Sequence, residues 1–132
     1  MYNKFGQFIN GKWQKSSGGE TYDVINPATE ELIGKASKAN KKDIDLCLKS
    51  AEEGFKIWKN ISPWERSKII RKISDLIRER KDILSKWLTL EVGKPLKESI
   101  GESNGAADIF EWSSEEAKRI YGETLQGRSL NT

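Results

Sequence analysis

The residue types that most enzymes use as nucleophile and base are nearly absent from this chain. It has one cysteine, Cys47, and no histidine among its 132 residues. Without histidine, neither a Ser-His nor a Cys-His pair can form, and zinc lacks its usual nitrogen ligand. Cys47 stands beside Leu48 on a predicted helix, so we interpret it as a small, partly buried helical residue.

The carboxylates and lysines offer no clearer catalytic set. The adjacent acidic pairs are Glu30–Glu31, Glu52–Glu53 and Glu115–Glu116. Neighbours on a helix point about 100° apart, so such a pair does not share one site. The segment from Gly101 to Gly105 lacks the strand–turn–helix setting of a phosphate-binding loop. Lys94 fits two interpretations, a contact with an anion or a cap on free helix carbonyls. The residues alone therefore identify no complete catalytic constellation.

The composition argues against several classes of function. The 23 basic and 20 acidic residues nearly cancel, whereas a nucleic-acid binder shows uncompensated Lys and Arg. No apolar run approaches the roughly 20 residues of a membrane span, and residues 1–13 lack the apolar block of a signal peptide. One cysteine makes a reducing compartment the default. We expect a soluble cytoplasmic protein in which five tryptophans supply much of the burial.

Short strands are predicted in the first third of the chain. Asn10-Gly11, flanked by strand-forming residues between positions 5 and 13, predicts a hairpin because both turn residues need positive φ. Residues 21–26 form a second strand candidate, which Pro27 ends, and residues 31–36 form a third. These strands are too few and too short to be an independent fold.

The remaining elements are predicted to be helices. Asn40 caps the first, with Asp43 three positions on, and its apolar stripe consists of Ile44, Leu48, Ala51, Phe55 and Trp58. A central helical stretch runs from 62 to 95. Ser62 is its N-cap, Pro63 is the first helical residue and Glu65 closes a capping box.

The central stretch is predicted to break and then stop. Four charges from Glu79 to Asp82 interrupt its apolar stripe, so we expect a kink or break near Arg80, with Asp82 as the cap of a second segment. Gly93 offers a left-handed stop, and Pro95 prevents continuation.

A third helical region is predicted over residues 96–121. Its apolar residues spread around more than one face, which favours partners on two sides. Gly101 and Gly105 lie one turn apart, where small residues allow another element to approach closely. Gly122 is the expected C-terminal stop.

Several phrases along the chain occur in an order and spacing that one protein family shares. They are Phe8-Ile9-Asn10-Gly11-Lys12-Trp13; Val24-Ile25-Asn26-Pro27-Ala28-Thr29-Glu30-Glu31-Leu32-Ile33-Gly34; Asp43-Ile44-Asp45 leading to Ala51 and Phe55-Lys56-Ile57-Trp58; Glu65-Arg66; Leu90-Glu91-Val92-Gly93-Lys94-Pro95-Leu96 with Glu98; Gly101-Glu102; and Glu116-Ala117-Lys118-Arg119-Ile120-Tyr121-Gly122-Glu123-Thr124. Together they resemble the N-terminal part of the aldehyde dehydrogenase superfamily. The last stretches look most similar to its NADP-linked succinate-semialdehyde dehydrogenase branch.

The resemblance implies oxidation of an aldehyde, such as succinate semialdehyde or a related semialdehyde, to its acid with NAD or NADP. In the family, a cysteine thiolate attacks the aldehyde, hydride passes to the nicotinamide and a glutamate activates water. The family's catalytic and nucleotide-binding motifs all follow the matched region, and Cys47 does not align with the catalytic cysteine. We therefore expect no catalytic and no cofactor-binding residue here, and a chain that is inert by itself.

The resemblance also implies a monovalent cation and a homo-oligomer in the full-length enzyme. The family's cation ligands are a backbone carbonyl before Asn-Pro, matching Val24 or Ile25, and a carboxylate before Gly-Lys-Pro, matching Glu91. Glu91 also fits a second interpretation, a helix-end acid bound to local backbone donors. No nucleic-acid or membrane partner is expected.

Two hypotheses remain for the chain as a whole. In the first, residues 1–132 are an incomplete N-terminal part of a nucleotide-binding domain, without the catalytic domain. The fold is then an α+β fragment of an α/β protein, with a hairpin and short strands followed by three or four amphipathic helices, and it exposes apolar patches. In the second, the chain is a stand-alone helical interaction module derived from a dehydrogenase, which would be a soluble monomer or dimer.

Overall fold

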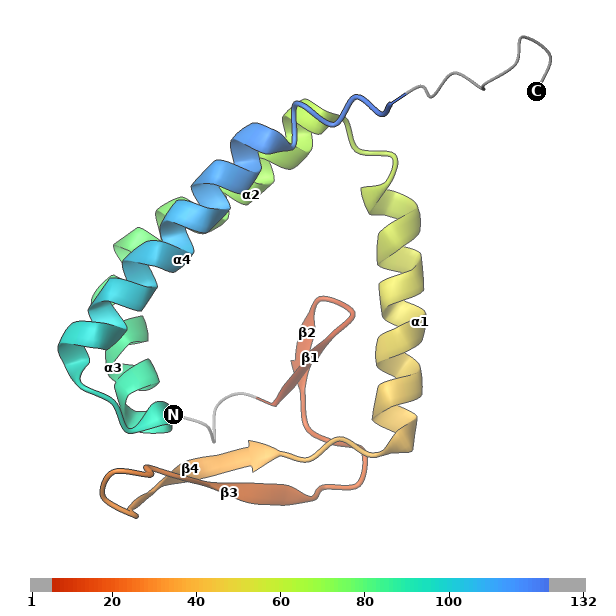
Figure 1. Ribbon diagram of the computed structural model, residues 1–132. Helices are drawn as coiled ribbons and strands as arrows, with labels where there is room; N and C mark the ends of the chain where they lie inside the picture. Colours follow the sequence, from red (N-terminus) through yellow and green to blue (C-terminus); the bar gives the residue numbers. More distant parts are fainter. Residues whose placement is uncertain (1–5, 124–132) are drawn as a thin grey trace, which may run out of the picture.

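The computed structural model describes residues 6–123, with the strands first and the helices after them (Figure 1). The elements are β1 (Gln7–Ile9), β2 (Lys12–Gln14), β3 (Thr21–Ile25), β4 (Leu32–Ser37), α1 (Lys41–Trp58), α2 (Pro63–Glu79), α3 (Lys81–Val92) and α4 (Leu96–Glu116). This order confirms the α+β arrangement expected from the sequence. Phe5, at the start of the predicted hairpin, and Thr124, at the end of the last family phrase, lie outside the described residues.

The first hairpin forms around the Asn-Gly turn as predicted. Asn10 has φ 54° and Gly11 has φ 73°, the left-handed values that a tight two-residue turn requires. β1 and β2 pair antiparallel, and the rings of Phe8 and Trp13 contact each other across the ladder with centroids 5.1 Å apart and planes tilted by 56°. β3 and β4 form a separate antiparallel pair, so the described strands make two small sheets rather than one.

A hydrogen-bonded turn joins β3 to β4. The buried Asn26 side chain accepts from the N–H of Ala28 at 2.9 Å, and the Asn26 carbonyl accepts from the N–H of Glu30 at 2.8 Å. The Asn26 N–H donates to the carbonyl of Glu31 at 2.9 Å. Glu30 has a left-handed φ of 60°, which closes the turn. These bonds fix Pro27 and Ala28 at the tip of the hairpin.

The start of α1 is held by a buried carboxylate. The Asn40 side chain accepts from the Asp43 N–H, and Asp43 accepts from the Asn40 N–H, each at 3.1 Å, which confirms the predicted cap as a full capping box. Asp43 also accepts from the Ser16 hydroxyl at 2.8 Å and the Ser17 N–H at 3.0 Å. One side chain therefore joins the loop after β2 to the first turn of α1.

These contacts shift the pKa of Asp43. Burial raises the pKa of this carboxyl, but hydrogen bonds from Asn40, Ser16 and Ser17 stabilise the ionised form and bring the pKa well below its ordinary value. The helix N-terminus also favours negative charge at this position.

The central stretch breaks near Arg80, as predicted. Arg80 has φ −101° and ψ 12°, and it separates α2 from α3. Asp82 lies inside the first turn of α3 and provides no side-chain cap, so that detail of the prediction was wrong. At the start of α2, Ser62 accepts from the Glu65 N–H at 3.2 Å, but the Glu65 carboxylate pairs with Lys68 instead of closing a capping box.

Helices α2 and α4 lie side by side and approach closely because small residues separate them (Figure 1). The Ser74 hydroxyl donates to the Ala107 carbonyl at 2.8 Å, and both residues are fully buried. Farther along, the buried hydroxyls of Ser85 and Ser103 lie 2.9 Å apart, joining α3 to α4. This interface is held by hydroxyl–carbonyl and hydroxyl–hydroxyl bonds in place of large apolar side chains.

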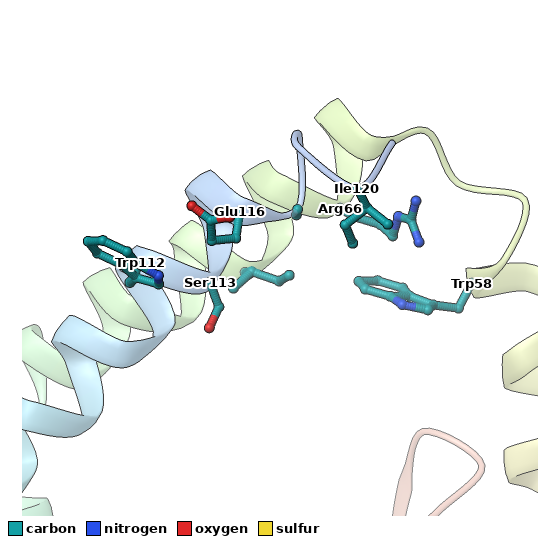
Figure 2. A pocket seen from close by; sticks show the side chains of 8 residues that line it. Trp58, Arg66, Trp112, Ser113, Glu116 and Ile120 are labelled. Carbon is teal, nitrogen blue, oxygen red and sulfur yellow. The ribbon is translucent and has the colours of Figure 1, made fainter. Parts of the chain in front are cut away.

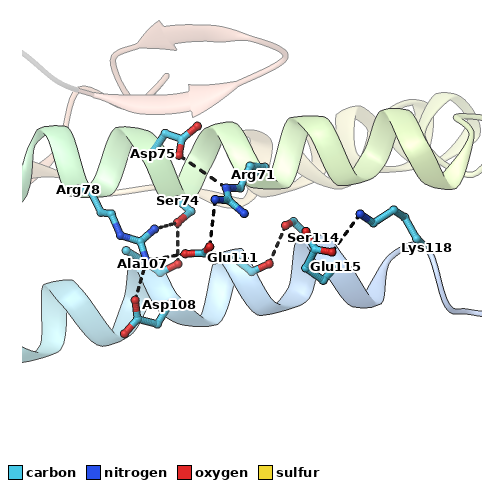
Figure 3. A network of polar contacts seen from close by, with 10 residues as sticks. All are labelled: Arg71, Ser74, Asp75, Arg78, Ala107, Asp108, Glu111, Ser114, Glu115 and Lys118. Atoms are coloured by element: carbon cyan, nitrogen blue, oxygen red, sulfur yellow. Dashed lines mark hydrogen bonds and ion pairs between the residues drawn. The ribbon is translucent and has the colours of Figure 1, made fainter.

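Charged residues flank the α2–α4 interface (Figure 3). Arg71 pairs with Glu111 at 3.0 Å, while Arg78 pairs with Glu111 and with Asp108, each at 2.7 Å. Arg78 also donates to the Ser74 hydroxyl. Because these ion pairs are partly exposed, each is worth less than about 1 kcal/mol, and the buried contacts set the helix spacing.

Two predictions for the last helical region were wrong in detail. A Cβ at Gly101 or Gly105 would meet no atom within 4 Å, so the close approach falls on the serine and alanine face instead. The helix ends at Glu116 and not at 121, because Lys118 and Arg119 continue in turns bonded to Glu115 and Glu116. Gly122 does adopt the expected left-handed φ, 71°.

Little apolar surface is buried within the described part of the chain. Its buried apolar residues are Ile9, Ala107 and Ala117. The accessible surface is 10558 Å², whereas a compact protein of this mass exposes about 7,000 Å². The expectation that tryptophans supply the burial was wrong: Trp87 is partly buried, but the exposed tryptophans are Trp13, Trp58, Trp64 and Trp112.

The depressed pKa of Asp43 predicts a loss of local stability in acid. Ionised Asp43 stabilises the fold above its unfolded pKa, near 4, and this contribution is lost as pH falls toward the lower folded value. In Asp43→Asn, protection of the α1 first-turn amides against hydrogen exchange should be about fivefold lower at neutral pH. Asp43→Asn should also lose much less of this protection than the wild type does when the pH falls below ~4.

The exposed Asp45 on the same helix is the matched control for this experiment. Asp45→Asn should keep both the wild-type protection and its decline in acid. Equal behaviour of the two variants would show that Asp43 does not hold the start of α1.

The small-residue interface predicts strong sensitivity to added volume. Ala107→Leu should lower the free energy of local opening of α2 and α4 by about 1–3 kcal/mol, because a buried site without space must expand. Ala106→Leu, at the partly buried neighbouring position, should cost clearly less. Amide hydrogen exchange of both helices measures the difference. Equal costs would mean that the close approach at Ala107 does not set the helix spacing.

Candidate functional site

The tip of the β3–β4 hairpin meets the C-terminal end of α3. Gly93 follows α3 with φ 72°, and its N–H donates to the Thr89 carbonyl at 2.9 Å, which confirms the predicted left-handed stop. A Cβ atom on Gly93 would lie 2.8 Å from Pro27 Cγ and 3.0 Å from the Ala28 nitrogen. Two segments more than sixty positions apart in the sequence are therefore in direct contact here.

The predicted cation ligands are near this contact in the sequence. Ile25 is the last residue of β3, two positions before Pro27, and Glu91 is two positions before Gly93 in the last turn of α3. The strand register is irregular here: Val24 pairs with Gly34 and Ile25 with Leu32, and Ile33 is passed over. Ile25 and Glu91 are both exposed.

The electrostatics at the end of α3 favour a positive charge. The last turn of α3 has no basic residue, and the Glu91 carboxylate adds to the negative end of the helix dipole. The positive charge of Lys94 does not serve this end of α3 alone, because the Lys94 ammonium also pairs with the Glu102 carboxylate on α4. The Lys94 side chain, only 15% exposed, therefore contacts a carboxylate of this chain, and both interpretations of Lys94 stay predictions.

No cluster of carboxylates supports a divalent-metal site in the part of the chain that the structure describes. Within residues 6–123, no group of three or more His, Cys, Asp or Glu side chains is placed to hold a metal ion. Any cation at Glu91 would thus need backbone oxygens as further ligands, as potassium sites commonly have. The assignment of Ile25 and Glu91 stays a prediction.

The other candidate residues take structural positions. Glu52 and Glu53 both contact Lys56, at 3.4 and 2.8 Å, as intrahelical ion pairs. Glu115 pairs with Lys118 at 3.0 Å, and the hydrogen bond and charge of Lys118 lower the pKa of Glu115. Cys47 is exposed, which corrects the expectation of partial burial within this chain.

A shallow apolar groove lies between the end of α1 and the α2–α4 pair (Figure 2). Trp58 and Ile120 lie at one end, and Trp112 lies at the other. Trp112 is 72% exposed and Ile120 is 74% exposed. The Nε atom of Arg66 is buried beside the groove with no hydrogen-bond partner among the described residues. The groove therefore has the character of an incomplete packing surface.

The described helices offer no membrane-spanning element, and the strand-to-helix connection is unsuited to a nucleotide. Among residues 6–123, none of the helices is sufficiently long and apolar to cross a bilayer. The β4–α1 connection, residues 38–40, contains no glycine. The Asn40 and Asp43 side chains bind each other's N–H groups at the start of α1, so a carboxylate stands where a phosphate would have to bind.

The sequence profile of the aldehyde dehydrogenase family matches residues 13–132. Because the match covers most of the chain, this chain belongs to the aldehyde dehydrogenase family. Among its curated relatives, glutarate-semialdehyde dehydrogenase of Pseudomonas putida is 40% identical over 120 residues, which are 91% of this chain and 25% of the relative. Succinate-semialdehyde dehydrogenase (NADP+) of Escherichia coli is 39% identical over 123 residues, 93% of this chain and 26% of the relative.

Solved structures show the same fold. An NADP-dependent enzyme of E. coli superposes with a TM-score of 0.87 at 37% identity, over 98% of this chain and 27% of that one. A betaine aldehyde dehydrogenase mutant of Staphylococcus aureus, in complex with NAD+, superposes with a TM-score of 0.88 at 29% identity, over 96% and 26%. The helices and short strands thus match the N-terminal part of the family's nucleotide-binding domain, which confirms the expected fold.

This chain spans about a quarter of the length of the relatives it matches. Sequence reasoning missed two contacts that position its elements, Ser16 with Asp43 and Gly93 with Pro27. The only sequence signal for the Ser16–Asp43 contact was weak, a pair of serines before two glycines in the predicted loop. The second had a better one, because Pro27 and Gly93 each lie in a phrase that resembles the family.

Proposed function

We propose that this chain forms the N-terminal part of the nucleotide-binding domain of an NAD(P)-dependent aldehyde dehydrogenase that oxidises succinate semialdehyde or a related semialdehyde. The observation that carries the proposal is the family match over residues 13–132. The relatives named glutarate-semialdehyde and succinate-semialdehyde dehydrogenase, about 40% identical, support the substrate class. The resemblance further predicts a homo-oligomer.

The surface of the chain supports a role as one part of a larger folded unit. The apolar stripe on α1 is predicted as a core face, yet Leu48 is 64% exposed and Phe55 is 62% exposed. Such faces require cover, and the remaining three quarters of the relatives' length is where the proposal places it.

The chemistry itself is assigned to residues outside this chain. When bound, the nicotinamide cofactor accepts the hydride that leaves the aldehyde carbon. At the helix start that follows β4, Asn40 and Asp43 occupy the place that a phosphate of this cofactor would need. We therefore assign this chain a scaffolding role and propose that it is inert alone. The alternative of a stand-alone interaction module has less support, since its helical faces are not covered by one another.

The proposal predicts a sharp difference between two preparations. The protein as its gene encodes it should oxidise succinate or glutarate semialdehyde with NADP or NAD, in a spectrophotometric assay of the reduced nicotinamide. The purified 132-residue chain should give no turnover above the uncatalysed rate. It should also bind a dye that reports exposed apolar surface, and Phe55→Lys should reduce that binding.

Lys49→Glu, a charge change beside the α1 stripe, is the matched control and should leave dye binding unchanged. Turnover by the isolated chain would contradict the scaffolding role. Absence of semialdehyde oxidation by the gene's product would contradict the proposed activity.

We also propose that Glu91, with a backbone carbonyl at Val24 or Ile25, binds a monovalent cation. The support is the negative end of α3, which has no basic residue in its last turn, and the contact of this end with the β3–β4 hairpin. Carbonyl and carboxylate oxygens are the ligands that alkali-metal ions accept. A cation here would be attracted both by the Glu91 carboxylate and by the negative end of the helix dipole.

The cation proposal predicts a potassium-dependent gain in stability. At equal ionic strength, replacing tetramethylammonium with potassium at about ten times its dissociation constant should stabilise the protein by about 1.4 kcal/mol. The gain appears as a rise of a few degrees in the melting temperature. Glu91→Gln should remove this rise.

Glu79→Gln, at the C-terminal residue of α2, is the matched control because it also neutralises a glutamate at a helix end. It should retain the potassium effect. If the wild type gains nothing from potassium, or if Glu91→Gln responds as the wild type does, the cation proposal is wrong.

A further inference from the structure

One polar group beside the apolar groove of Figure 2 is left without a partner by the described residues. The group belongs to Arg66, a partly buried residue near the start of α2, whose Nε atom is buried. We propose that the groove is a docking surface for a later segment of the same polypeptide, which brings apolar side chains and one carboxylate that pairs with Arg66. The inference rests on the proposed function, because that segment belongs to the part of the enzyme outside this chain.

The walls of the groove determine the apolar part of the partner. Trp58 comes from the end of α1, Ile70 from α2 and Trp112 from α4, so three helices form one apolar surface. The groove is shallow and encloses about 270 Å³, less than the roughly 300–1,000 Å³ that is typical of small-molecule pockets. A protein segment that lays its side chains along the groove fits this shape better. The cores of protein interfaces are enriched in aromatic residues and arginine, as this groove is.

The charge of Arg66 determines the polar part of the partner. A guanidinium group cannot lose its proton in a protein, so it stays charged when an apolar segment removes its remaining water. A buried charge without a counter-charge is strongly destabilising. Glu116 also lines the groove, but its carboxylate pairs with Arg119 at 2.7 Å. A neutral carbonyl would leave the charge of Arg66 uncompensated, whereas a carboxylate both balances it and accepts two parallel hydrogen bonds.

The position of the groove indicates that the partner segment follows later in the same polypeptide. Helix α4 ends at Glu116, and the chain leaves it along the groove, with Ala117 and Ile120 among the lining residues. A segment tethered at this point reaches the groove at a far higher effective concentration than a separate molecule does. Residues 124–132 contain no Asp or Glu. The proposed carboxylate therefore lies beyond residue 132, in the part of the relatives' length that this chain does not cover.

Carbodiimide cross-linking tests for the carboxylate directly, because the reagent joins an amine only to a carboxylate in contact with it. Arginine does not react in this way, so Arg66→Lys places a reporting amine in the groove of the protein as its gene encodes it. Mass spectrometry of the digested protein should find position 66 joined to an Asp or Glu beyond residue 132. The same link should be absent from the wild type.

Arg71→Lys is the matched control, because Arg71 lies on the same helix and pairs with Glu111 of this chain at 3.0 Å. This variant should give a link to Glu111, or to Asp75 at 3.8 Å, and none beyond residue 132. A second measurement needs no substitution and serves if Arg66→Lys does not fold. Phenylglyoxal should modify Arg66 of the wild-type protein far more slowly than it modifies arginine in an unfolded reference peptide.

The possible outcomes separate this inference from the proposed function. If Arg66→Lys links to no acid, or only to Glu116 or another acid of this chain, while Arg71→Lys reacts as expected, the docking surface is wrong. A link between two copies, detected by mixing isotopically labelled and unlabelled protein, would overturn it in favour of a subunit interface. Rapid modification of Arg66 by phenylglyoxal would overturn it as well. A link beyond residue 132 in a protein without semialdehyde turnover would support the docking surface and contradict the proposed activity alone.

Discussion

The main physical constraint on this chain is that its helices expose apolar faces that its own described residues do not cover. In a compact protein, the stripes on α1 and α4 would meet inside a common core. Here α1 stands apart from the layer of α2, α3 and α4, and its extensive contacts are with β1 (Figure 1). The helices have formed, but most of the burial that stabilises helices in water is still to be supplied from outside the described residues.

Polar and small residues keep the elements in place despite this weak core. Asp43 fastens the loop after β2 to α1, and serine and alanine contacts hold α2, α3 and α4 together. Such contacts are directional, so they fix positions accurately while contributing little burial. The result suits a scaffold, because it preserves the orientation of the apolar faces until a partner surface covers them.

Sequence reasoning predicted what depends on local patterns and missed what depends on distant contacts. The Asn10-Gly11 turn, the Asn40 cap, the break at Arg80 and the Gly93 stop each follow from a few neighbouring residues, and all are present. The burial of the tryptophans and Cys47 was mispredicted because periodicity identifies an apolar face but not what lies against it. The role of Gly101 and Gly105 was mispredicted for the same reason. No local pattern indicates that Pro27 lies against Gly93; the only signal is that each residue belongs to a phrase that resembles the family.

The central claim is that these apolar faces are covered in the working protein. Hydroxyl-radical labelling of Phe55 and Trp112, in protein purified from the cells that express its gene, tests it most directly. These side chains are 62% and 72% exposed in this chain alone. The account predicts labelling far slower than in an unfolded reference peptide. Labelling at the rate expected for side chains this exposed would contradict it.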